Sequence, residues 1–189
     1  MDPGLRHAGM TGDPVFLWAD TFNNYFRADI ASAAWEVLSD AGFAVEVPQT
    51  RQHLCCGRPL YDFGLLKSAK KYLERVLQAL EPAVNAGLPV IMVEPSCASV
   101  FRDELRNLFP HHGVAYRLRQ QTFTLSSFLQ TQVPGYEPPK LRGKKVLLHG
   151  HCHHRAVLPF SHEEVDQTDG SRAEIAGQWM LRDGWPVWL

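Results

Sequence analysis

Four short apolar runs, separated by stretches with helical periodicity, limit the fold of this 189-residue chain more than any other feature. The runs cover residues 14–19, 43–47, 88–93 and 144–149, and each is followed by an acidic residue, proline or glycine. Short runs of this kind predict buried strands. Strands that alternate with helices pair in parallel through crossover connections. We therefore predict an α/β fold with a mostly parallel sheet and crossover helices.

The segments between these runs predict two clear amphipathic helices. Residues 28–41 place an apolar residue on one face at each turn, and Gly42 stands where a C-cap glycine belongs. Residues 65–79 form a second such helix, and Pro82 is expected to lie beyond its end. Residues 22–26 are rich in turn formers and predict a turn after the first strand. A further short helix is expected over residues 124–132.

All four cysteines lie shortly after predicted strands. Adjacent Cys55 and Cys56, followed by Gly57, come after the second strand, Cys97 follows the third, and Cys152 follows the fourth. Ligands of parallel sheets gather at the carboxyl ends of the strands, so we expect these thiols to converge. Soft thiolates at such an edge suit iron, zinc or redox exchange.

Three other positions near the cysteines invite specific predictions. Ser96 is expected to cap a helix, which would place Cys97 in its first turn and favour the thiolate there. Asp20, at the end of the first strand, is expected to serve as a turn or cap residue. Arg58 is expected to be exposed, with pairing to a negatively charged group as the alternative.

Composition and charge exclude several classes of function. Nineteen basic residues against twenty acidic ones give a net charge of -1, and no basic run supports nucleic-acid binding. The first ten residues lack the apolar core of a signal peptide, and no apolar run is long enough to cross a bilayer. A cytoplasmic protein is therefore expected, and its thiols are expected to serve ligation or redox chemistry instead of structural disulfides.

Four sequence segments together resemble one known family. They are Asp-Thr-Phe-Asn-Asn-Tyr at 20–25, Cys-Cys-Gly-Arg-Pro at 55–59, Glu-Pro-Ser-Cys-Ala-Ser at 94–99 and His-Cys-His-His at 151–154. In this order they resemble the cysteine-rich CCG domain found in heterodisulfide reductase and in the iron-sulfur subunit of glycolate oxidase. They also resemble the C-terminal region of FAD-linked D-lactate and D-2-hydroxyglutarate dehydrogenases. The resemblance covers residues 14–158.

The resemblance implies an iron-sulfur cluster, of the 4Fe-4S class, with an incomplete set of ligands. Asp20 stands at the family's first cysteine position, and Val100 stands at the last cysteine of the first repeat. The thiols that the resemblance assigns to the cluster are Cys55, Cys56, Cys97 and Cys152. It implies no catalytic residue in this chain.

The resemblance also implies a domain organisation and a partner. The expected parts are a leader at 1–13, a first CCG-type unit at 14–132, a linker at 133–143, the start of a second unit at 144–158, and an atypical tail at 159–189. Such a chain would be the electron-transfer module, or a fragment of it, of an FAD-linked 2-hydroxyacid dehydrogenase. FAD is expected in a flavin-containing partner domain or subunit, because the chain shows no flavin domain of its own.

Two other functions are consistent with the same residues. The first is a zinc-stabilised structural or docking domain that adds His151 or His153 to the thiols, since imidazole and thiolate both suit zinc. The second is a degenerate, truncated or frameshifted fragment that binds no metal.

Overall fold

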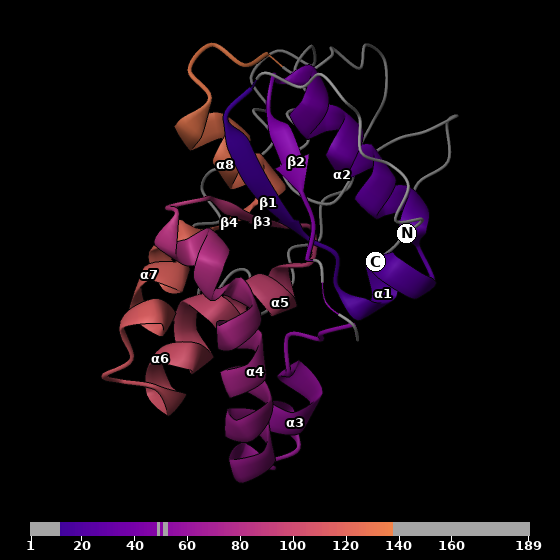
Figure 1. The fold of residues 1–189 in the computed structure, drawn as a ribbon. Helices are drawn as coiled ribbons and strands as arrows, with labels where there is room; N and C mark the ends of the chain where they lie inside the picture. Colours follow the sequence, from indigo (N-terminus) through magenta and orange to yellow (C-terminus); the bar gives the residue numbers. More distant parts are fainter. Residues whose placement is uncertain (1–11, 49, 51–52, 138–189) are drawn as a thin grey trace, which may run out of the picture.

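A parallel sheet forms the centre of the computed structural model, which describes residues 12–48, 50 and 53–137 (Figure 1). In these residues the sheet has four strands, β1 (Pro14–Trp18), β2 (Ala44–Glu46), β3 (Val90–Met92) and β4 (Thr122–Thr124). Their order is β2-β1-β3-β4, and every neighbouring pair is parallel. The prediction of an α/β fold with a parallel sheet and crossover helices is confirmed.

Helices cover both faces of the sheet, because alternate residues of each strand point to opposite sides. From β1, Val15 and Leu17 pack with α2 (Ala28–Asp40) and α8 (Leu125–Gln132) in one cluster. On the other face, the β1 side chains pack against α4 (Leu66–Asn85) and α7 (Gly113–Gln121). They also pack against a continuous helical segment, which consists of α5 (Pro95–Ser99), a π-helical turn (Val100–Glu104) and α6 (Leu105–Leu108). Figure 1 shows the two layers on either side of the strands.

Trp18 is the largest fully buried side chain on the second of these faces. Its indole ring meets the ring of Phe101 edge-on, with the centroids 5.1 Å apart. Cys56 and Cys97 belong to the same buried cluster as Trp18. The hydrophobic core on this face therefore extends directly to the predicted thiol site.

The predicted helix ends are confirmed in one case and wrong in another. Gly42 has a φ of 93° just after α2, and the Phe43 N–H donates to the Leu38 carbonyl, as the predicted C-cap requires. α4 continues beyond Pro82 to Asn85, although Pro82 was expected to follow its end. A proline removes one N–H from the helix, but Val84 is buried in the core and favours continuation.

Four further elements were not predicted. The segment expected to form a turn is a short helix, α1 (Thr21–Tyr25), and another short helix, α3 (Arg58–Asp62), follows the paired cysteines. α7 and β4 also went unpredicted, since α7 carries few apolar residues and β4 has only three residues. None of the helices in the described residues is both long and apolar enough to span a bilayer.

The described elements run from Pro14 to Gln132, which are also the bounds of the first predicted unit. The linker is described only through Glu137. The predicted start of a second unit at 144–158 and the tail at 159–189 lie outside the described residues. The division of the chain into these units therefore stays a prediction.

Candidate thiol site

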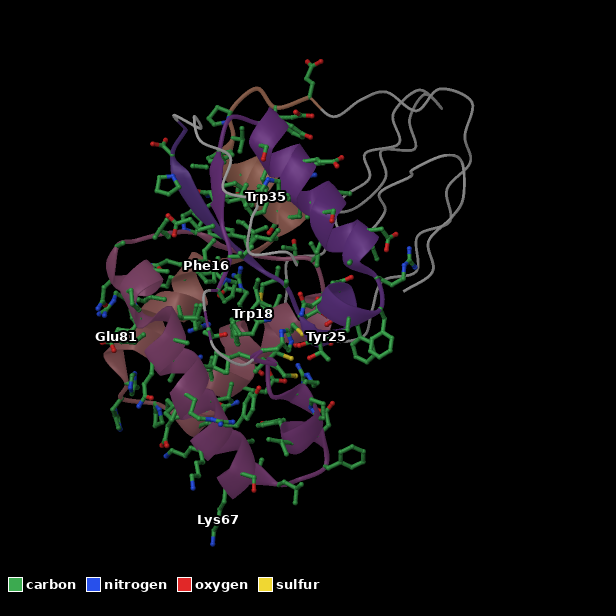
Figure 2. The ribbon with its side chains drawn as sticks, turned by 45° about the vertical axis from the view of Figure 1, so that its right-hand side comes forward. Phe16, Trp18, Tyr25, Trp35, Lys67 and Glu81 are labelled. Atoms are coloured by element: carbon green, nitrogen blue, oxygen red, sulfur yellow. The ribbon has the colours of Figure 1, made fainter. Side chains whose placement is uncertain are left out.

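The candidate site lies at the carboxyl edge of the sheet. β1 ends two residues before Asp20, and β3 leads through Glu94 into α5, which carries Cys97. The segment 53–57, which carries Cys55 and Cys56, comes to the same place after β2. Figure 2 shows the sulfur atoms gathered near Trp18 and Tyr25.

Three of the four predicted thiols are brought together. The Cys56 and Cys97 sulfur atoms lie 2.9 Å apart and are hydrogen-bonded. This separation is longer than the roughly 2.05 Å of a disulfide, and both cysteines are free. Cys56 is 2% exposed and Cys97 7%, whereas Cys55 is half-buried and hydrogen-bonded to the Cys56 thiol. Cys152 lies outside the described residues.

The surroundings keep these thiols protonated in the metal-free protein. The hydrogen bond with Cys56 and burial raise the Cys55 pKa. The hydrogen bond with Cys55 lowers the Cys56 pKa, but the one with Cys97 and burial outweigh it. For Cys97, the hydrogen bond with Cys56 lowers the pKa, but burial and the negative charges of Glu94 and Asp20 raise it overall. A metal that binds here must therefore displace protons.

The expectations for Ser96 and for a Cys97 thiolate are wrong. Glu94 is the N-cap of α5, and its carboxylate accepts a hydrogen bond from the Cys97 N–H at 2.8 Å. The Ser96 hydroxyl donates to the same carboxylate. Pro95 takes the first helical position, which proline favours, so the cap falls on the residue before it. The N-cap of α5 is therefore a carboxylate, that of Glu94. Burial and the negative charge of this carboxylate raise the Cys97 pKa.

Asp20 is confirmed as a cap residue. Its carboxylate accepts hydrogen bonds from the backbone N–H groups of Phe22 at 2.9 Å and Asn23 at 3.2 Å, at the start of α1. The Asn23 side-chain amide donates to the second oxygen at 2.5 Å. Asp20 is 2% exposed, and burial raises its pKa despite the hydrogen bonds from Asn23.

Two residues near Cys55 were missed by sequence reasoning. The Tyr72 hydroxyl accepts a hydrogen bond from the Cys55 N–H at 2.7 Å, which fixes the backbone of the cysteine pair against α4. The Nε2 atom of His53 lies 3.1 Å from the Thr21 hydroxyl oxygen, and the His53 ring meets the Tyr25 ring edge-on. Burial lowers the His53 pKa, so the ring stays neutral at pH 7. No sequence motif links either residue to the cysteines.

Arg58 is buried, so the expectation of an exposed arginine is wrong. It is 8% exposed, and its Nη1 atom lies 2.5 Å from Oε1 of the buried Glu104. Its Nη2 atom donates to the Ser96 carbonyl at 3.0 Å and to the Ser99 hydroxyl. Because Ser96 and Ser99 flank Cys97, the guanidinium ties the cysteine-pair loop to α5. No sequence motif indicates this pairing, since Glu104 is 46 residues away.

Gly57 makes the turn that directs Cys55 and Cys56 toward Cys97. Its φ is 83°, in the left-handed region that favours glycine, and it leads directly into α3. A Cβ atom here would lie 3.4 Å from the Leu73 side chain. This is an ordinary contact distance, so the conformation of the turn, and not a lack of space, calls for glycine.

Gly57→Ala is expected to lower the free energy of unfolding by about 1–2 kcal/mol, the cost of a left-handed residue with a Cβ. Urea denaturation followed by circular dichroism measures this change. Gly42→Ala is the matched control, since Gly42 also has a positive φ but open space around its Cβ position. The two variants should lose similar stability, and only Gly57→Ala should reduce metal binding. Equal metal binding by both variants would show that the turn does not position the thiols.

The donor set suits a soft metal but is not complete within the described residues. No group of three or more Cys, His, Asp or Glu side chains there is arranged to hold a metal ion. Thiolates on one tetrahedral metal lie roughly 3.8 Å apart, given metal–sulfur bonds of about 2.3 Å. The Cys56 and Cys97 sulfurs would thus separate by roughly 0.9 Å on binding. The Trp18 indole N–H, buried in the same cluster, has no acceptor among the described residues and suits a ligand that offers one.

The fold and the site define an α/β domain with a buried thiol cluster at the carboxyl edge of a parallel sheet. The chain is similar to "Lactate utilization protein A" of Bacillus velezensis, with 29% identity over 155 residues, which is 80% of this chain and 62% of the relative. The protein of the same name from Bacillus licheniformis is 28% identical over 148 residues, 76% of this chain and 59% of that protein. The one from Bacillus subtilis is 26% identical over 155 residues, 80% and 62% of the two chains.

This similarity is distant and partial. The chain spans about three fifths of the length of these relatives. No family model matches the chain, and no solved structure matches it.

Proposed function

We propose that this chain is an iron-sulfur electron-transfer module of a 2-hydroxyacid dehydrogenase system. The observation that carries the proposal is the 2.9 Å contact between the Cys56 and Cys97 sulfurs, formed by residues 41 positions apart at the carboxyl edge of the sheet. Cys55 and Cys152 are proposed as the remaining thiolate ligands. When bound, the cluster would supply one-electron transfer between a reduced flavin and an acceptor.

The residues around the thiols have distinct tasks in this proposal. Arg58 and Gly57 fix the positions of the two cysteine-bearing segments relative to each other. Burial of Cys56 and Cys97 keeps water from their sulfurs. The carboxylates of Asp20 and Glu94 act electrostatically on Cys97. Net charge near a cluster sets its reduction potential, and added negative charge lowers it. These two carboxylates therefore favour a centre of low potential.

The proposed substrate of the whole system is lactate. The name of the similar proteins, "Lactate utilization protein A", favours lactate over the other hydroxy acids that the sequence resemblance implies. We assign no step of lactate oxidation to residues of this chain. The flavin is proposed to lie in a partner subunit or domain, and the electron passes from there to the thiol site.

Anaerobic reconstitution of the full chain with iron and sulfide tests the proposal. Iron and acid-labile sulfide are expected to stay with the protein through gel filtration, with visible absorption from thiolate-to-iron charge transfer. A variant with all four cysteines changed to serine is the control and is expected to retain neither. Equal iron in the two proteins would refute the proposal. Zinc bound without sulfide, in a colourless protein, would instead support the zinc-stabilised domain.

A further inference from the structure

We propose that Cys56 and Cys97 form a reversible disulfide when no metal is bound. Their sulfur atoms already lie 2.9 Å apart, so bond formation needs an approach of roughly 0.9 Å. Both are free and buried, and each belongs to a different segment of the site. Among the described thiols, the sulfur–sulfur hydrogen bond between segments distant in sequence joins Cys56 to Cys97.

The protein holds these two sulfurs together without help from a metal. Arg58 lies two residues after Cys56, and its guanidinium donates to the Ser96 carbonyl and the Ser99 hydroxyl on either side of Cys97. Its ion pair with buried Glu104 fixes the guanidinium in place. Since the sulfurs are brought together before any reaction, the disulfide needs little further ordering of the chain.

Cys55 gives an oxidant access to the buried pair. It is half-buried and hydrogen-bonded to Cys56, whereas Cys56 and Cys97 are almost completely covered. The small fraction of Cys55 present as thiolate attacks a small disulfide such as oxidised glutathione, and one glutathione leaves as a thiol with the proton that Cys55 lost. Cys56 then attacks the Cys55 sulfur and releases the second, and Cys97 attacks Cys56 and returns Cys55 to a thiol. Overall, two protein thiols are oxidised to one disulfide and one glutathione disulfide is reduced to two thiols.

The disulfide would also prevent metal binding. Two sulfurs bonded to each other are not thiolates, and thiolates are the ligands that a soft metal requires. The site would then load metal only after reduction. This consequence rests on the proposed function, but the disulfide itself does not.

Peptide mapping of the full chain tests the disulfide. The reduced, metal-free protein is treated with oxidised glutathione, its remaining thiols are blocked, and it is digested with trypsin without reduction. We expect the peptide of residues 52–67 linked to that of residues 76–102, a link that dithiothreitol removes. Glutathione adducts without this link, or another cysteine pair as the main product, would overturn the inference.

Cysteine variants identify the linked sulfur, because Cys55 and Cys56 share one tryptic peptide. Cys55→Ser is expected to form the same link to the same extent, only more slowly, and Cys152→Ser is expected to form it unchanged. Cys56→Ser is expected to lose it, with circular dichroism confirming that the variant is folded. A link of wild-type yield in folded Cys56→Ser would overturn the inference.

Iron loading separates this inference from the proposed function. The oxidised protein is expected to take up no iron until it is reduced. If the disulfide forms but the reduced protein also binds no iron, the proposed function fails and the disulfide stands. If the reduced protein binds iron but no Cys56–Cys97 link forms, the disulfide is refuted and the proposed function stands.

Discussion

Arg58→Ala is expected to lower the free energy of unfolding by about 3–5 kcal/mol, because it leaves the buried Glu104 carboxylate without its partner. The variant also removes hydrogen bonds to the Ser96 carbonyl and the Ser99 hydroxyl. Domains of this size have a total stability of about 5–15 kcal/mol, so the loss would be a large share of it. Urea denaturation followed by far-ultraviolet circular dichroism measures the effect, and metal binding is expected to fall with it.

Two controls separate the buried ion pair from a general effect of charge. In Arg58→Ala/Glu104→Gln no buried carboxylate is left unpaired, so part of the lost stability should return. Arg27 pairs with Asp29 at 2.9 Å, but both side chains are largely exposed, so Arg27→Ala should leave the urea midpoint nearly unchanged. If Arg58→Ala is no less stable than Arg27→Ala, the buried guanidinium does not hold the two segments together.

The features that could be predicted from sequence are those set by local pattern. Apolar runs followed by amphipathic helices correctly predicted the parallel sheet, and the positions of Cys56 and Cys97 after strands correctly predicted that they would meet. Gly42 as a C-cap and Asp20 as an N-cap were also correctly predicted, because caps depend only on neighbours in the chain.

The features that could not be predicted depend on contacts between distant residues. The burial of Arg58 follows from Glu104, and the position of Tyr72 against Cys55 follows from the packing of α4. Burial and the charge of Glu94 raise the Cys97 pKa, and the charge of Asp20 adds to them. Asp20 is 77 residues earlier and reaches the site because β1 and β3 are neighbours. Sequence spacing carries no information on such pairs.

Asp20→Cys is expected to increase the affinity of the protein for iron. The increase should exceed the roughly 10–100-fold change in metal affinity that substitutions outside the ligand set cause. Asp20 is buried at the carboxyl end of β1, and its charge acts on Cys97 and His53. The sequence resemblance also places the family's first cysteine at this position. A thiolate there would join those of Cys55, Cys56 and Cys97, and it would place a soft sulfur where the wild type has a hard carboxylate oxygen. Iron and sulfide retained after anaerobic reconstitution measure the gain.

The substitution also removes a cap, and its controls must account for that. The Asp20 carboxylate accepts from the Phe22 and Asn23 N–H groups, so losing it should cost about 1 kcal/mol. Asp20→Asn keeps a capping oxygen without the charge, and Asp20→Ser has the size of cysteine without the sulfur. Both should bind no more iron than the wild type, so a gain confined to Asp20→Cys would come from the thiolate. If Asp20→Cys binds no more iron than Asp20→Ser, position 20 does not face the ligands.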